Sequence, residues 1–297
     1  MSSRFVMKVM IGFYMLIFFT YLFGPLVMMG VSAFNTPSYP QAVPFEAFTL
    51  HWFADLFKDR DMMDGLKNSL IIGFGVVAIS VPVGLAASIL MMQIYWRARS
   101  LYYLVAVSPV LTPGVIIGIS TVIFWKDMSG VMGTKFLYQG IVLAIFGQAS
   151  FICAYCMLII MARLQRFDRA QEEAALDLGA SYPQVFWHVL LPFLKPALFS
   201  AGIIAFLSSF ENYNTTTFAI LADKTLVTVI AGRVRQGTTP ALSALAVMII
   251  ALSLAGAILF EILRRREEAK AARIKENARL AEEAGAGAIM GRAATAG

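Results

Sequence analysis

Long apolar stretches dominate the chain, and they limit what it can fold into more than any single motif does. A helix needs roughly 20 mostly apolar residues to cross about 30 Å of hydrocarbon. Six stretches meet this requirement: 9–33, 69–94, 101–125, 140–162, 196–221 and 241–263. Only 14% of the 297 residues are charged, whereas about a quarter of an average soluble domain is charged. The sequence therefore predicts an all-α integral membrane protein with six transmembrane helices.

The two ends of the chain define its domains. The first stretch follows Arg4 and Lys8, as the core of a signal peptide would, but it is too long for one and no small-x-small cleavage site follows it. We therefore assign residues 1–263 to one transmembrane domain. The remaining residues, 264–297, are expected to form a charged cytoplasmic tail that is helical at first and then disordered in its Ala-Gly-rich part.

The distribution of lysine and arginine predicts the orientation, because positive residues resist translocation and accumulate on the cytoplasmic side. With the N-terminus inside, 16 of the 24 Lys and Arg residues fall on the cytoplasmic side and eight fall outside. We therefore expect both termini in the cytoplasm. This bias accounts for most of the net charge of +6, so we infer no nucleic-acid partner.

The longest internal cytoplasmic segment in this topology, 164–195, separates the fourth and fifth stretches. Its part 172–177 is rich in helix formers, and Gly179 stands where a left-handed C-terminal cap is needed. Ser181 is followed three residues later by Gln184, the spacing of a capping box that starts a helix. The segment is therefore predicted to form two short helices joined by a hinge.

The same segment contains a spaced motif, E-A-A-x3-G-x9-V-x-L-P, and its proline is expected to end the second helix. The motif positions are Glu173, Ala174, Ala175, Gly179, Val189, Leu191 and Pro192. This spacing resembles the EAA signature of ATP-binding-cassette (ABC) importer permeases, although isoleucine is usual at the position of Val189. An ordinary amphipathic linker is the alternative, but it would not explain seven spaced positions at this point of the topology.

The resemblance implies the type I importer permease (MetI-like) fold in the bacterial inner membrane. It also implies that the hinged helices insert into a cleft on a separate ATPase. The implied docking residues are Glu173, Ala174, Ala175, Asp177, Gly179 and Ala180. The implied partners are a second permease subunit, two ATP-binding subunits and an extracytoplasmic solute-binding protein.

Catalytic and cofactor motifs are missing from the sequence. It contains no G-x-x-x-x-G-K-[ST] nucleotide-binding loop, and neither a Ser-His-Asp arrangement nor a metal-ligand cluster is readable. We therefore expect ATP to be bound and hydrolysed by a partner subunit. This chain is predicted to be no enzyme by itself and to bind no cofactor or metal.

A polar run, 208–217, interrupts the fifth stretch. An acidic residue inside a span costs roughly 2.5 kcal/mol or more, so Glu211 should face the bundle interior or a wet cavity. Counting about 1.5 Å per residue from Pro196 places Glu211 about 22 Å along the helix, near an external gate. The sequence is equally compatible with two other roles for the Glu211 carboxylate: an ion pair with Lys or Arg of the partner subunit, or a place in a water-filled gate that does not contact the cargo. The candidate substrate path comprises Ser208, Phe210, Glu211, Asn212 and Tyr213.

The second half of the chain, SFENYNTTTFAIL followed by 238–240, most resembles the second permease of spermidine/putrescine importers. That family typically carries an acidic pair here, whereas this chain has Glu211 followed by Asn212. The resemblance implies a polyamine or a related small cationic amine as cargo. Thiamine, an opine, 2-aminoethylphosphonate and ferric iron remain alternatives, as does an ATP-independent secondary transporter.

Three further features of the sequence lead to expectations about local structure. Pro109 and Pro113 should break or kink the third stretch, either to line a cavity or only for packing. Cys153 and Cys156 form a C-x-x-C pattern in the fourth stretch, where we expect them to pack as inert side chains. The polar segment after the first stretch is predicted to form a loop and a short helix with Trp52 near the lipid headgroups.

Overall fold

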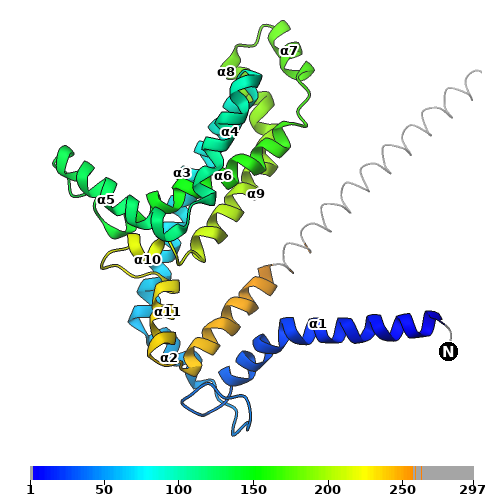
Figure 1. Cartoon of the computed structure of the whole chain (residues 1–297), viewed down its shortest axis with the longest axis vertical. Helices are drawn as coiled ribbons and strands as arrows, with labels where there is room; N and C mark the ends of the chain where they lie inside the picture. Colours follow the sequence, from blue (N-terminus) through cyan, green and yellow to red (C-terminus); the bar gives the residue numbers. More distant parts are fainter. Residues whose placement is uncertain (1–2, 257, 259–261, 263–297) are drawn as a thin grey trace, which may run out of the picture. The chain divides into compact units, whose positions relative to one another are not determined.

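A computed structural model describes residues 3–256, 258 and 262 (Figure 1). The chain divides into two compact units, one formed by Phe57–Thr238 and the other by Met1–Leu56 together with the chain from Thr239 onward. Within the described residues the structure is helical, and the one strand-like pairing is an isolated bridge between Asn35 and Phe48. The tail predicted for 264–297 lies outside the described residues.

Three long helices form the centre of the unit Phe57–Thr238. α3 (Arg60–Gln93), α6 (Gly140–Leu164) and α9 (Leu191–Phe210) all pack against one another. Their shared core includes Ile72 of α3, Ile152 of α6 and Leu194 of α9, each at most 1% exposed. Ala201 and Ala205 of α9 are fully buried, because small side chains let membrane helices approach closely.

The third predicted stretch is two helices. α4 (Trp96–Leu111) and α5 (Gly114–Met132) are separated at Thr112 and Pro113, so the predicted break is confirmed and the single span 101–125 is wrong. Pro113 has no N–H with which to continue α4, and it takes the N-cap position of α5 instead.

The fifth predicted stretch begins earlier and ends earlier than 196–221. α7 (Ala170–Asp177) is followed by α8 (Tyr182–Val185), a π-helical turn (Phe186–Leu190) and then α9, and the helical chain is continuous from Tyr182 to Phe210. The prediction that Pro192 ends the second helix is therefore wrong. The Leu191 N–H donates to the Phe186 carbonyl, and this five-residue spacing shifts the hydrogen-bond register just before the proline, which has no N–H to donate.

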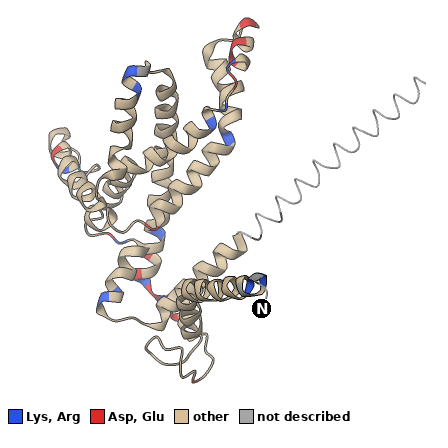
Figure 2. Cartoon of the chain, turned by 45° about the vertical axis from the view of Figure 1, so that its right-hand side comes forward, with Lys and Arg blue, Asp and Glu red and all other residues tan. Residues whose placement is uncertain are grey.

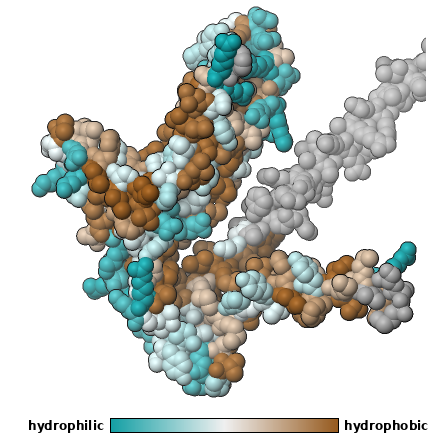
Figure 3. Space-filling view, viewed as in Figure 1, coloured by the Kyte–Doolittle hydropathy of each residue, from teal (hydrophilic) through white to brown (hydrophobic). Residues whose placement is uncertain are grey.

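Among the described residues, five helical segments are long and apolar enough to cross a membrane: Met7–Ala33 within α1 (Ser3–Ala33), α3, α5, α6 and Tyr182–Phe210. Pro240–Gly256 forms a shorter apolar helix. Charged residues gather near the helix ends of the unit Phe57–Thr238 (Figure 2), and the sides of its helices are largely apolar (Figure 3). These features indicate a multi-pass membrane protein, while six spans and cytoplasmic termini remain predictions.

The segment after α1 is organised around Asn35, which is 1% exposed. Its amide donates to the carbonyls of Gln41 and Pro44, and its backbone carbonyl accepts the indole N–H of Trp52 at 2.7 Å. Trp52 belongs to α2 (His51–Lys58), which confirms the predicted short helix. Because protein already binds the indole N–H, a headgroup role for Trp52 remains a prediction.

Two further short helices, α10 (Thr216–Ala219) and α11 (Leu226–Gln236), follow α9. Both lie in the unit Phe57–Thr238, and they pack against its longer helices: α10 on α5 and α6, and α11 on α3. Neither helix was predicted from the sequence. α10, with four residues, is too short to show a helical repeat of apolar residues, whereas α11, with 11 residues, is long enough and was missed.

Gly84 lies where α3 comes close to α6, and the space beside it is too small for a larger side chain. A Cβ at Gly84 would lie 2.6 Å from the Cβ of Cys156 and 2.8 Å from the backbone nitrogen of Met157. At Gly202 of α9 an added Cβ would meet nothing closer than 3.7 Å. We expect Gly84→Ala to lower the free energy of unfolding by about 1–3 kcal/mol through overpacking, and Gly202→Ala to be neutral or slightly stabilising. Thermal unfolding in detergent measures both, and equal midpoints for the two variants would contradict this packing.

Candidate functional site

The hinge between α7 and α8 has the geometry that its glycine predicted. Gly179 has a φ of 86°, a conformation that favours glycine. Its N–H donates to the Leu176 carbonyl at 2.9 Å, and the Ala180 N–H donates to the Ala175 carbonyl at 3.1 Å. These two bonds form a Schellman motif, so the predicted left-handed cap is confirmed.

The second helix restarts directly after this cap. The backbone N–H of Ser181 donates to Oε1 of Gln184 at 2.7 Å, and Tyr182 is the first residue of α8. The predicted capping box is therefore confirmed. The hinge is only three residues long, Gly179 to Ser181, which leaves little slack between α7 and the long helix that follows.

The base of this loop is held by the last turn of α6. The guanidinium of Arg163 lies 4.3 Å from the ring centroid of Phe193, and its Nε donates to the Phe193 carbonyl at 3.4 Å. The ring of Phe167 lies 5.1 Å from the ring of Phe193. α6 and α9 are thus joined where the loop leaves the bundle.

The predicted docking residues lie on one projecting loop. Glu173, Ala174, Asp177 and Gly179 are exposed, and Ala175 and Ala180 are half-buried. A groove of about 440 Å³ runs between α7 and the start of the second helix, with Ala175, Gly179, Ala180 and Val185 among its lining residues. Acidic residues gather on α7 at this end of the unit (Figure 2).

Sequence reasoning missed Leu178, which also lines the groove and is 90% exposed. Tyr182, on the other side of the hinge, is 73% exposed. Apolar side chains on a polar loop are suited to burial by a partner protein. The sequence does contain a signal for this residue: Leu178 is a large apolar side chain directly before the glycine that ends α7.

Glu211 lies at the end of α9, so its prediction as a residue inside a span 196–221 is wrong. Glu211 is the C-cap, its N–H donates to the Leu207 carbonyl at 3.1 Å, and its side chain is exposed. The depth of about 22 Å counted from Pro196 stays a prediction, although the helix itself begins earlier, at Tyr182.

The other residues of the candidate substrate path surround this helix end. Ser208 and Phe210 are half-buried in the last turn of α9. Oδ1 of Asn212 accepts the N–H groups of Thr215 and Thr216 at 3.2 and 3.3 Å, so this side chain holds the turn that leads into α10. The hydroxyl of Tyr213 accepts a hydrogen bond from Arg235 at 2.9 Å.

A buried polar network fixes the same helix end from inside the bundle. Nε2 of Gln148, which is 1% exposed, donates to the Thr216 hydroxyl at 2.7 Å, and its Oε1 accepts the Ser209 hydroxyl at 2.5 Å. These bonds join α6, α9 and α10. Sequence reasoning missed Gln148, although a single amide inside an otherwise apolar stretch is typical of a contact between membrane helices.

Ion pairs and a hydrogen bond hold α11 and the segment before it against the start of α3. Lys224 pairs with Asp61 at 2.9 Å, Arg233 pairs with Asp59, and the Leu226 N–H donates to the Ser69 hydroxyl at 2.9 Å. Burial by itself raises the pKa of Asp59, but the hydrogen bonds from Arg233 and from the Met62 N–H outweigh it and hold that pKa below its usual value. The contribution of Asp59 to the contact between α11 and α3 is therefore fully present at pH values above the ordinary pKa of aspartate. It is lost as the pH falls through the lowered pKa of Asp59.

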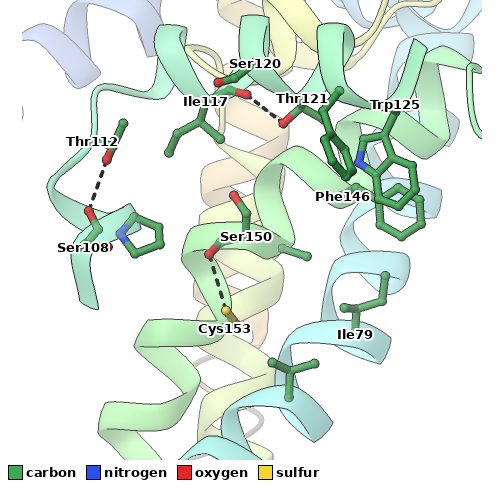
Figure 4. A pocket seen from close by; sticks show the side chains of 14 residues that line it. Ile79, Ser108, Thr112, Ile117, Ser120, Thr121, Trp125, Phe146, Ser150 and Cys153 are labelled. Carbon is green, nitrogen blue, oxygen red and sulfur yellow. Dashed lines mark hydrogen bonds between the residues drawn. The ribbon is translucent and has the colours of Figure 1, made fainter. Parts of the chain in front are cut away.

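The break between α4 and α5 lines a cavity of about 570 Å³ (Figure 4). Pro109 and Thr112 contribute to the cavity wall, as one of the two interpretations of the break predicted, whereas Pro113 is not among the lining residues. Cys153 lines the same cavity, whereas Cys156 is buried against the carbonyl of Ala201. No group of three or more His, Cys, Asp or Glu residues that could hold a metal ion occurs in the described part of the chain.

Residues 80–268 match the family described as binding-protein-dependent transport system inner membrane component. The chain belongs to this family. It is therefore a transport component, the permease subunit of an ABC importer. The motif spacing from Glu173 to Pro192 predicted this assignment. The match includes the whole of α4 to α11, with the hinged loop and the segment around Glu211.

Relatives of this permease match nearly the full length. The putrescine transport system permease protein PotI of Escherichia coli K12 is 27% identical over 257 residues, which is 86% of this chain and 90% of the relative. The spermidine/putrescine transport system permease protein PotC of Haemophilus influenzae is 25% identical over 265 residues, covering 89% and 98%. These relatives are permease proteins.

A solved structure supports the fold of the permease. It is a bacterial ABC transporter involved in the import of the acidic polysaccharide alginate, and it covers 89% of this chain and 98% of its own with a TM-score of 0.63 at 15% identity. Since that transporter carries an acidic polymer and the sequence relatives are named for amines, the fold by itself does not determine the cargo.

Proposed function

We propose that this permease passes a polyamine or a related small cationic amine inward across the bacterial inner membrane, driven by ATP hydrolysis on separate subunits. One observation carries the cargo assignment: the PotI and PotC relatives, named for putrescine and spermidine, align over nearly their entire lengths. Glu211, exposed at the end of α9, supplies a carboxylate that attracts cations and would repel anions.

The proposed assembly contains a second permease subunit, two ATP-binding subunits and an extracytoplasmic solute-binding protein. The hinged loop faces the cytoplasm, with both termini on the same side, in agreement with the distribution of Lys and Arg. ATP binds only to the partner subunits. The proposed docking surface consists of Glu173, Ala174, Ala175, Asp177, Gly179 and Ala180 together with Leu178. The 90% exposure of this apolar side chain supports the proposal that a partner buries it.

The continuous helix supports a mechanical form of coupling. The 29 residues from Tyr182 to Phe210 span about 43 Å at about 1.5 Å per residue. One end adjoins the Gly179–Ser181 hinge and the other end adjoins Glu211. When the ATPase subunits close and move α7, the long helix carries this movement to the polar segment, and the helix bundle rotates as a rigid body.

The docking surface leads to a direct prediction. We expect Leu178→Asp to reduce co-purification of the ATPase at least about tenfold, because an exposed apolar anchor becomes charged in a desolvated contact. Gly179→Val should have a similar effect, because a β-branched residue is strained at a φ of 86°. Val131→Asp is the matched control, since Val131 is 85% exposed at the end of α5. Membrane insertion and ATPase co-purification are measured separately.

If the Leu178 and Gly179 variants insert normally, retain the ATPase and sustain uptake, the docking assignment is wrong. Loss of the ATPase from the Val131 variant as well would show a general effect of added charge. Glu173→Gln extends the test to the motif residue on α7, and it should weaken the ATPase contact less than Leu178→Asp does.

Glu211 leads to a second prediction, on cargo. We expect Glu211→Gln to reduce uptake of spermidine and putrescine about threefold, because one solvent-exposed charge interaction with a cation is lost. Asp127→Asn is the control, since Asp127 is also exposed but lies on α5. Uptake of thiamine, an opine, 2-aminoethylphosphonate and ferric iron is compared in the same cells. Unchanged uptake of every cation would remove Glu211 from the path.

A further inference from the structure

The cavity at the break between α4 and α5, hereafter the break cavity, has a wall chemistry that the docking loop and Glu211 do not explain. Its lining comes from α3, α4, α5 and α6, all within the unit Phe57–Thr238. No Asp, Glu, Lys, Arg or His is among its lining residues, and Glu211 is not part of it. It is lined instead by five hydroxyl groups, three aromatic rings of which two are stacked as a pair, the thiol of Cys153 and aliphatic side chains (Figure 4).

Every one of the five hydroxyls donates its proton to a carbonyl of its own helix. Thr121 donates to Ile117 at 2.7 Å, and Ser150 donates to Gly147 at 2.7 Å. The same pattern holds for Ser108, Thr112 and Ser120. A hydroxyl has one proton and two lone pairs, so each of these oxygens can only accept a further hydrogen bond. The wall therefore suits a ligand that carries N–H donors.

The helix ends at the break favour a positive charge. The last turn of α4 contributes Ser108, Pro109 and Thr112 to the wall, whereas α5 contributes only from Ile117 onward. The carbonyl end of a helix carries partial negative charge, and broken membrane helices use such ends to coordinate cations. Of the positive N-terminal turn of α5, only its last residue, Ile117, is part of the lining.

The aromatic pair adds a second attraction for a cation. The rings of Trp125 and Phe146 are stacked with centroids 4.5 Å apart, and both side chains line the cavity. An ammonium group is attracted to the face of an indole. Ile79 and Val83 of α3 offer apolar contact for methylene groups, which a small inorganic ion cannot use. An anion would find only one side-chain N–H in the lining, the indole of Trp125.

We propose that the break cavity binds an organic ammonium group and its alkyl chain, without any carboxylate, as a transit site for amines within the membrane. The proposal rests on the proposed function for the identity of the cargo. Binding itself requires no ATP, and this allows the two proposals to be tested separately.

The test is equilibrium binding of labelled putrescine to the full chain in lipid nanodiscs. Unlabelled putrescine should compete, whereas 1,4-butanediol and succinate, which have the same number of carbon atoms but no positive charge, should not. We expect Trp125→Leu to weaken binding roughly tenfold and Trp125→Phe to weaken it only about threefold, since phenylalanine keeps an aromatic face.

Two serines with the same bonding pattern provide a matched pair. Ser150→Ala removes an acceptor from the cavity and should weaken binding roughly threefold. Ser200→Ala is the control, because Ser200 also donates to its own helix, at 2.9 Å to the Pro196 carbonyl, but lies outside the lining. It should bind putrescine as the unchanged chain does.

Several outcomes would overturn the break cavity as an amine site. These are absence of putrescine binding, equal competition by the diol or by succinate, and unchanged binding in both Trp125→Leu and Ser150→Ala. Loss of binding in Glu211→Gln without any effect of Trp125→Leu would place the amine at Glu211 instead. If binding behaves as expected but the assembled transporter shows no ATP-driven amine uptake, the proposed function fails and the cavity assignment stands.

Discussion

Within hydrocarbon, every backbone polar group needs a partner inside the protein, and the arrangement of this permease depends on how it meets that constraint at each interruption of a helix. At the break between α4 and α5, a proline removes the N–H that would otherwise lack a partner. At the end of α9, Asn212 and Gln148 bind the turn that leads into α10. Before Pro192, a π-helical turn shifts the register so that the helix continues. The interruptions are thus specific structures, and two of them coincide with the proposed path of the cargo.

Local chemistry made some of these features predictable from the sequence. Gly179 and the Ser181–Gln184 spacing each imply a conformation within a few residues, and both were confirmed. The apolar stretches identified the membrane class, and the motif from Glu173 to Pro192 identified the family. Pro192 misled the prediction, because proline usually ends a helix and a compensating π turn leaves no signal in the apolar pattern. The hydrogen bonds of Gln148 were also not predicted, because they join residues more than 60 positions apart in the sequence.

The proposed mechanism assigns separate tasks to the two ends of one helix. At the hinge, exposed Leu178 and the Glu173 motif are proposed to contact the ATPase. At the other end, the segment around Glu211 and the break cavity provide two different environments for a cation: a single exposed carboxylate, and a wall of hydroxyl acceptors and aromatic faces. Transport requires that the cargo leaves each site easily, so its affinity should be moderate at both sites. The rigid helix between hinge and path would allow movement of α7 to change access to these sites.

The rigidity of that helix is the central claim, and an electron-spin distance between labels at positions 187 and 207 tests it most directly. Both Trp187 and Leu207 are exposed, at 62% and 54%, so labels fit there once Cys153 and Cys156 are replaced by serine. Because the two positions are about 20 helical steps apart, one narrow distance distribution near about 30 Å is expected in the assembled transporter, with and without ATP. A broad distribution, or one that shifts by several Å when ATP is added, would show bending at the π turn and would contradict the proposed coupling.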